Sequence, residues 1–163
     1  DKPILFKNLY ASLRVQAIAH YLPESLFIIT HRNEIDNGHS LLETRQTVFG
    51  NHEDWWSMEP PDTQLLKKLP AHQQVIEQIR HIHTAIEHDL ELAKVPKSRR
   101  FHLSYEEFCA NPVLTIEALH DFLEANGCKV ARRSAPPAGL KRRDTIKIDK
   151  LAYKAMADYA NRS

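Results

Sequence analysis

Apolar and polar positions follow one another along the chain in blocks that predict strands separated by helices. Continuous apolar runs predict buried strands at residues 3–8, 25–32 and 100–108. Apolar positions at near-helical spacing predict helices at 10–22, 34–49, 72–94, 111–127 and 147–162. This alternation predicts an α/β fold, a three-layer parallel sheet with helices on both faces and a C-terminal helical tail.

Local signals at the ends of these segments predict where helices begin and stop. In the helix after the third strand, Asn111 is the expected cap, Pro112 the first helical residue and Gly127 the stop. Asp36 or Asn37 is the expected cap of the helix after the second strand. The stretch 50–62 after that helix is expected to be a loop or a broken helix, and 130–144, before the last helix, is expected to be a basic, proline-containing loop.

Composition narrows the classes of partner. The 163 residues include 22 Lys and Arg and 21 Asp and Glu, so the net charge of +1 gives no overall attraction for nucleic acid or membranes. No apolar run approaches the roughly 20 residues of a membrane span. Two cysteines, Cys109 and Cys128, are too few for a disulfide scaffold, and free thiols in the reducing cytoplasm are expected. The length suits one domain, and any anion site must be a local cluster of charge.

Chemistry-bearing side chains follow the predicted strands. Lys7 ends the first strand, Arg32 ends the second, and Tyr105 lies at the end of the third. Because the carboxyl ends of parallel strands share one edge of a sheet, we expect these residues to line one site. Cations there can bind phosphate or sulfate, and a tyrosine face can stack on a base. Ser40, eight residues after Arg32, would add a hydroxyl to the same anion.

Structural interpretations of the same residues stay open. Arg32 can instead pair with the neighbouring carboxylates of Glu34 or Asp36, Lys7 can be a solvated strand end, and Tyr105 can be a core residue.

Histidines and tryptophans suggest two further sites. The ten histidines show no metal motif, and neighbours such as His81 and His83 point to different sides of a helix, so no metal is expected. Trp55 and Trp56 either line a pocket for an acceptor molecule or fill the core beneath a loop.

The ordered set of segments resembles the sulfotransferases that use 3′-phosphoadenosine 5′-phosphosulfate (PAPS). That family has a lysine ending a strand, then a helix, a proline, and an apolar strand ending in arginine, with a serine eight residues later. The corresponding segments are "ILFKN" (4–8), "YLPESLFIITHR" (21–32) and "NEIDNGHS" (33–40), followed by "LSYEEFCANP" (103–112). The "WW" and "PP" within 55–61 resemble a microbial or carbohydrate-type branch.

The resemblance implies a role for each matching residue and a P-loop NTPase-like fold. Arg32 and Ser40 would bind the 3′-phosphate of the nucleotide, and Tyr105 would contact the adenine. Lys7 would be the catalytic residue, steadying charge on the leaving phosphate as cations do in phosphoryl transfer.

The chain also departs from the family pattern. The strand, loop and helix that cradle the phosphosulfate are absent, and we expect them upstream of Asp1. The positions after Lys7 that carry a histidine base in many relatives are Asn8 to Ala11. The basic loop near the C-terminus has a loose counterpart in "AGLKRR", where Arg142 or Arg143 would reach the 3′-phosphate.

These observations favour one sulfotransferase-like domain over residues 1–163, without its N-terminal strand, loop and helix. The expected activity is sulfuryl transfer from PAPS to a hydroxyl or amine of a small-molecule or carbohydrate acceptor. The alternatives are another P-loop kinase-like nucleotide-binding protein and a non-catalytic α/β interaction module.

Overall fold

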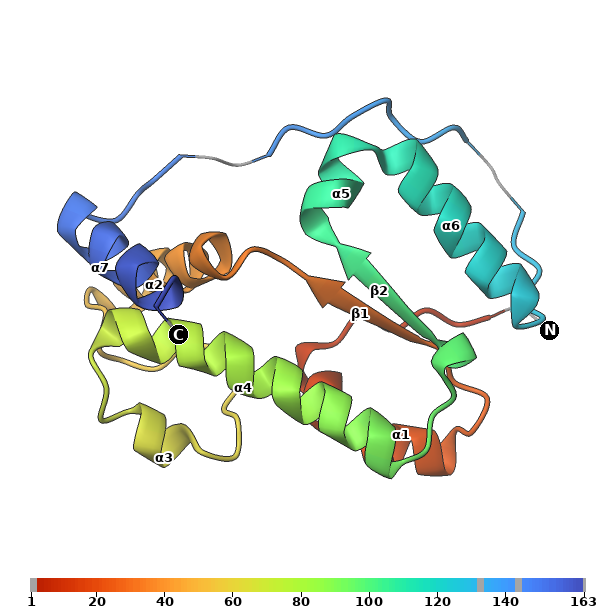
Figure 1. The fold of residues 1–163 in the computed structure, drawn as a ribbon, viewed down its shortest axis with the longest axis horizontal. Helices are drawn as coiled ribbons and strands as arrows, with labels where there is room; N and C mark the ends of the chain where they lie inside the picture. The colour runs from red at the N-terminus through yellow and green to blue at the C-terminus, as the bar shows by residue number, and fades with distance from the viewer. Residues whose placement is uncertain (1–2, 132–133, 143–144, 163) are drawn as a thin grey trace. The chain divides into compact units, whose positions relative to one another are not determined.

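Helices dominate the fold, and two strands form one parallel sheet (Figure 1). The computed structural model describes residues 3–131, 134–142 and 145–162. Its elements are η1 (Leu9–Leu13), α1 (Val15–Tyr21), β1 (Phe27–His31), α2 (Glu34–Phe49), α3 (Thr63–Leu66), α4 (Ala71–Leu92), η2 (Lys97–Arg99), β2 (Arg100–Ser104), α5 (Tyr105–Ala110), α6 (Pro112–Ala125) and α7 (Lys150–Ala160). The predicted α/β class with parallel pairing is confirmed, and the larger three-layer sheet stays a prediction.

The chain folds into two compact units, each built from separate stretches of sequence. The first unit contains Asp1–Asn8, Gln16–Arg32 and Leu90–Arg143, and therefore holds the sheet, α5 and α6. The second contains Leu9–Val15, Asn33–Asp89 and Asp144–Ser163, and holds α2, α3, most of α4 and α7. Among the described residues, no helix has both the length and the apolar character that crossing a membrane requires.

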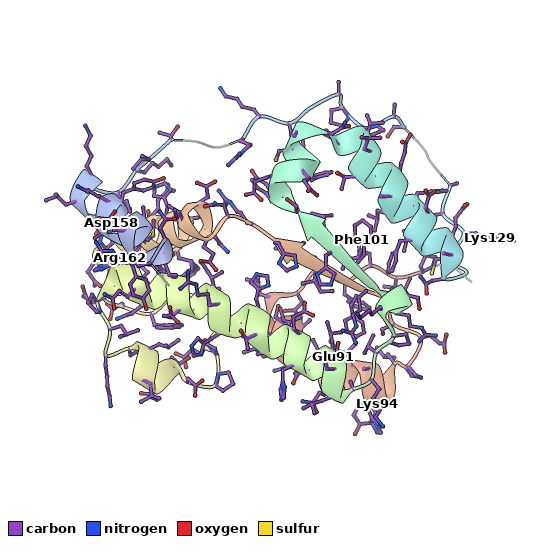
Figure 2. All side chains as sticks on the ribbon, viewed as in Figure 1. Glu91, Lys94, Phe101, Lys129, Asp158 and Arg162 are labelled. Carbon is purple, nitrogen blue, oxygen red and sulfur yellow. The ribbon has the colours of Figure 1, made fainter. Side chains whose placement is uncertain are left out.

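The sheet of the first unit pairs β1 and β2 in one parallel register. Phe27 lies opposite Arg100 at one end, and His31 lies opposite Ser104 at the other. Phe101 of β2, labelled in Figure 2, packs on Phe122 of α6. The ring centroids lie 5.3 Å apart. This aromatic contact helps α6 cover the sheet, because burying two phenyl rings removes a large apolar area from water.

Helix termini in the first unit follow the predicted local signals. The Asn111 side chain accepts a hydrogen bond from the Leu114 N–H at 3.2 Å, and Pro112 is the first residue of α6. Gly127 ends the helical segment with φ of 77°, and the following N–H of Cys128 bonds the Leu123 carbonyl. The cap, the proline and the glycine stop are therefore confirmed. Cys109 and Cys128 are both free, as predicted.

The core of the second unit lies where α2, α4 and α7 meet. Its fully buried members are apolar side chains from these helices and the segment before α7, namely Leu42, Val75, Ile76, Ile148 and Met156. Gly38 permits the close approach of α2, since a Cβ there would lie 2.9 Å from the Met156 sulfur. The Asp149 side chain caps α7 by accepting a hydrogen bond from the Ala152 N–H.

An ion-pair network reinforces this core. Arg80 of α4 donates to both carboxylate oxygens of Glu34, with Nη2 2.8 Å from Oε2, and to the Ala160 carbonyl at the end of α7. The Tyr159 hydroxyl donates to Glu77 at 3.0 Å. One guanidinium thus joins α4 to the beginning of α2 and the end of α7.

Two sequence predictions for the first unit need correction. Residues 3–8 form no strand: Ile4, Leu5 and Phe6 are 78–82% exposed, because an apolar run becomes a strand only where a partner strand takes its hydrogen bonds. The strand predicted at 100–108 ends at Ser104, whose side chain caps a helix by accepting from the Glu107 N–H. A local cap therefore overrides the apolar continuation of β2.

Three helix predictions also need correction. The helix predicted at 10–22 consists of η1 and α1, with a break at Arg14. Asn33 caps α2 through bonds to the N–H groups of Ile35 and Asp36, so the predicted caps Asp36 and Asn37 lie inside the helix. The bounds 34–49 themselves are confirmed. The closing helix is shorter than predicted, at Lys150–Ala160.

Candidate functional site

The carboxyl ends of β1 and β2 bring a cation onto an aromatic ring. Arg32 directly follows β1 and Tyr105 directly follows β2. Because His31 lies opposite Ser104, the parallel register places the next residue of each strand opposite the other. The Arg32 guanidinium carbon lies 4.9 Å from the Tyr105 ring centroid, which is the geometry of a cation–π contact.

Arg32 has no protein partner for its charge in the part of the chain that the structure describes. Its Nε is buried and makes no hydrogen bond there, and no carboxylate pairs with its guanidinium. The nearby carboxylate of Glu34 is instead held by Arg80. A buried donor without a partner costs free energy, and an added anion would remove that cost. The ion-pair interpretation of Arg32 therefore has no support among the described residues.

Tyr105 is the first residue of α5, and its hydroxyl interacts with the Cys109 side chain of the same helix. The hydrogen bond between its hydroxyl and the Cys109 side chain, followed by burial, raises the pKa of Tyr105 above its usual value. The positive charges of Arg32 and Arg142 oppose this rise. Cys109 is itself buried, at 4% exposure. The ring is thus fixed at its polar end while its face accepts the Arg32 guanidinium.

The basic segment "AGLKRR" is attached to the same helix. The Leu140 N–H donates to the Cys109 carbonyl at 2.9 Å, and Gly139 lies against the same carbonyl. Arg142 follows two residues later, with an exposed side chain whose charge acts on Tyr105. Arg142 therefore joins Arg32 in making the surroundings of Tyr105 positive, whereas Arg143 lies outside the described residues.

The structure does not place the two other predicted site residues, Lys7 and Ser40, beside Arg32 and Tyr105. Lys7 is in the first unit, in the exposed segment before η1, and no hydrogen bond or cation–π contact joins it to Arg32 or Tyr105 among the described residues. Ser40 is in the second unit, on α2, where its carbonyl accepts a hydrogen bond from the Thr44 hydroxyl. Its place beside Arg32 stays a prediction.

A histidine pair on the sheet was not anticipated by the sequence analysis. His31 Nε2 and His102 Nδ1 lie 2.9 Å apart, and their ring centroids are 5.2 Å apart with an interplanar angle of 23°. A hydrogen bond at this distance needs one ring nitrogen as donor and the other as acceptor, and the two rings are stacked nearly parallel. The pair depends on the register of two strands 71 residues apart, so no local signal could have identified it.

Comparisons with known proteins link this site to a family. A family model whose description reads "Sulfotransferase family" matches residues 2–126, which is most of the 163-residue chain. The match includes Lys7, Arg32, Ser40 and Tyr105 and ends before Arg142. Searches of curated proteins and of solved structures each found no match.

Proposed function

The chain belongs to the sulfotransferase family, and we propose that it transfers a sulfuryl group from PAPS to a hydroxyl or amine. The observation that carries the proposal is the unpartnered Arg32 stacked on Tyr105 at the end of the sheet. A nucleotide presents both of the groups that this pair lacks, namely an anion for the guanidinium and a planar base for the aromatic side chain. The family supplies the identity of that nucleotide.

Arg32 and Arg142 have the charge and the donors to bind the 3′-phosphate of PAPS. Arg32 offers a planar fork of donors that matches phosphate oxygens, and its buried Nε has no competing acceptor among the described residues. Arg142 adds a second positive charge beside Tyr105. We infer that Arg32, Arg142 and Ser40 hold the 3′-phosphate, together with Arg143, and that Tyr105 contacts the adenine.

Lys7 is the proposed catalytic residue. PAPS, when bound, supplies the sulfuryl group that is transferred. Lys7 would place its ammonium against the charge that builds up on the leaving phosphate, as positioned cations do in phosphoryl transfer. Its segment is exposed and extended, so this role requires residues 3–8 to pack against further structure when the donor is bound.

We also infer a larger P-loop-like sheet around β1 and β2, because a two-stranded parallel sheet is small for the family's α/β fold. The acceptor is proposed to be a small molecule or carbohydrate, as in the microbial or carbohydrate-type branch.

Thermal unfolding of the full chain with two nucleotides tests the donor proposal. We expect 3′,5′-diphosphoadenosine to raise the melting temperature and ATP to raise it much less, because ligand that binds only the folded state stabilises it by mass action. Equal shifts with both nucleotides would favour a P-loop kinase-like protein. No shift with either would favour an interaction module and overturn the proposal.

A further inference from the structure

The second unit carries an open surface pocket, called the cavity below, that the proposed donor site does not use. Its volume is about 620 Å³. Aromatic and charged side chains from the end of α2, the loop after it and the end of α3 line it, namely Phe49, Glu53, Asp54, Trp55, Glu59 and Lys67. Three carboxylates and one ammonium give this lining a net negative charge.

The loop after α2 is ordered by a single asparagine. The Asn51 side-chain oxygen accepts hydrogen bonds from the backbone N–H groups of Glu53 and Asp54, at 2.8 and 2.9 Å. Its amide nitrogen donates to the Asp54 carboxylate at 2.9 Å. This local turn places two exposed carboxylates side by side on the cavity wall.

Trp55, the tryptophan of the lining, contacts a buried cation of the protein. Arg45 is fully buried, and its guanidinium carbon lies 5.0 Å from the Trp55 ring centroid. The indole N–H of Trp55 donates to the Met58 carbonyl at 3.3 Å. Arg45 in turn donates to the Gln74 side chain at 2.8 Å. The ring is therefore anchored before any ligand arrives, which lowers the entropy cost of binding.

The cavity already holds one ammonium group of the protein itself. Lys67 Nζ lies 5.7 Å from the Trp55 ring centroid and 2.9 Å from a Glu59 carboxylate oxygen. An aromatic face and a carboxylate together are the combination that recognises organic cations. The position of the Lys67 ammonium therefore indicates that Trp55 and Glu59 favour a positively charged nitrogen.

Glu53 is a second carboxylate of the lining. Its side chain is exposed and makes no hydrogen bond or ion pair with any residue that the structure describes, although its negative charge acts on the buried Arg45 guanidinium. Asp54 beside it is bonded only by the neutral amide of Asn51 among the described residues. Both carboxylates can therefore accept a new cation without breaking an ion pair.

We propose that this cavity binds a small organic ammonium compound of about monosaccharide size. Its ammonium group is held by Glu53 and Asp54, and its apolar face lies on Phe49 and Trp55. Anionic ligands are disfavoured because they would meet three carboxylates in the lining. The inference concerns binding alone and stands whether or not the donor proposal is correct.

Glucosamine and N-acetylglucosamine form a matched pair of probes, because they share a ring and differ in the charge on nitrogen. The chain has two tryptophans, so the indole N–H signals in an NMR titration report directly on the wall once a Trp56→Phe variant has assigned them. We expect glucosamine to shift the Trp55 signal and to bind at least about fivefold more tightly than N-acetylglucosamine. Added salt should weaken glucosamine binding.

A double variant tests the two carboxylates. Glu53→Gln with Asp54→Asn should weaken glucosamine binding at least about tenfold, because charge-assisted bonds become neutral ones. Asp158→Asn is the matched control: Asp158 is an exposed carboxylate on α7, outside the cavity lining, and its loss should leave binding unchanged (Figure 2).

Three results would overturn the proposal: no shift of Trp55 with glucosamine, equal affinity for both sugars, or full affinity in the double variant. Unchanged amide spectra outside the cavity keep these results separate from misfolding. A protein that binds diphosphoadenosine but not glucosamine would retain the donor site and lose only this one.

Discussion

Two arginines, Arg45 in the second unit and Arg32 in the first, each have a buried Nε without a partner among the described residues. Arg45 nevertheless gives its other nitrogens to neutral acceptors, donating to the His52 carbonyl at 3.0 Å and to Gln74 at 2.8 Å. Arg32 has no such bonds in the described part of the chain and faces only the Tyr105 ring. The fold therefore gives Arg45 acceptors for its terminal nitrogens, whereas the described residues give Arg32 none, which is what we propose for an anion-binding arginine.

Burial changes the pKa of the Arg45 guanidinium. It lowers the pKa of Arg45 to about 10, and the negative charge of Glu53 opposes that fall. The guanidinium remains charged at neutral pH, and it orders the loop that carries Trp55. Arg80 is a third case, since its pKa is raised mainly by its hydrogen bond to Glu34. An arginine's partners, and not its burial alone, thus distinguish a structural role from a binding role.

The largest expected effect is on stability, in Arg45→Ala. The substitution leaves Gln74 and Gln78 without a donor and opens a cavity, so we expect a loss of about 3 kcal/mol in the free energy of unfolding. Urea denaturation measures it, with Arg14→Ala, an exposed arginine of the same unit, as the control. A loss below about 1 kcal/mol would contradict the structural role that distinguishes Arg45 from Arg32.

The next effect is on binding, in Arg32→Ala. We expect the affinity for 3′,5′-diphosphoadenosine to fall roughly 30-fold, or about 2 kcal/mol, because a charge-assisted bidentate contact is removed. The free energy of unfolding should change by less than about 0.5 kcal/mol. Isothermal titration calorimetry measures the affinity, and Arg162→Ala, an exposed arginine after α7 (Figure 2), is the control.

Arg32→Lys sharpens that result. Lysine keeps the charge and loses the planar fork, so an intermediate affinity is expected. Wild-type affinity in Arg32→Ala would remove Arg32 from the site.

A smaller effect is expected for Arg80→Ala, which should lower the free energy of unfolding by about 1 kcal/mol because the ion pair is partly exposed. A double-mutant cycle with Glu34→Gln measures the coupling between the two side chains. Additive losses would mean that Arg80 acts through the Ala160 carbonyl and not through Glu34. Diphosphoadenosine binding should be unchanged, in contrast to Arg32→Ala.

The smallest effect is the pH dependence that Tyr105 contributes. Its pKa is raised by the hydrogen bond to Cys109 and by burial, so the folded state favours the protonated hydroxyl. The resulting stability is fully present below the usual tyrosine value of about 10 and is lost as pH rises through the higher folded-state pKa. Burial and the hydrogen bond to Glu77 raise the pKa of Tyr159 as well, so ultraviolet titration should show a late phase that Tyr105→Phe reduces and that Tyr159 still contributes to.

Tyr21→Phe, at an exposed tyrosine, should leave that late phase intact. If Tyr105→Phe leaves it unchanged as well, the hydroxyl is not held by Cys109. Replacing Cys109 by alanine should move the ionisation of Tyr105 to lower pH.

Elements with complete local signals were predictable from the sequence. The end of α2 matches because a glycine, Gly50, follows its last residue and takes φ of 75° as the C-cap. The start of α6 follows from Asn111 and Pro112, which supply a cap and a preformed φ. The site could be anticipated as far as Arg32 and Tyr105 being at the ends of neighbouring strands.

Where local signals compete, the sequence left the outcome open. Asn33, Asp36 and Asn37 are all capable caps, and the cap that forms depends on where the chain leaves β1. The apolar run at 3–8 reads as a strand, yet a strand requires hydrogen bonds from another segment.

The sequence by itself determined the family, the helices with strong caps and the two residues that follow the strands. Only the tertiary structure decided which charges are satisfied. Glu34 lies two residues from Arg32, but it pairs with Arg80, 46 residues away. Charge pairing is settled by distance in space and by the loss of solvent around each group, and neither quantity can be read from spacing along the chain.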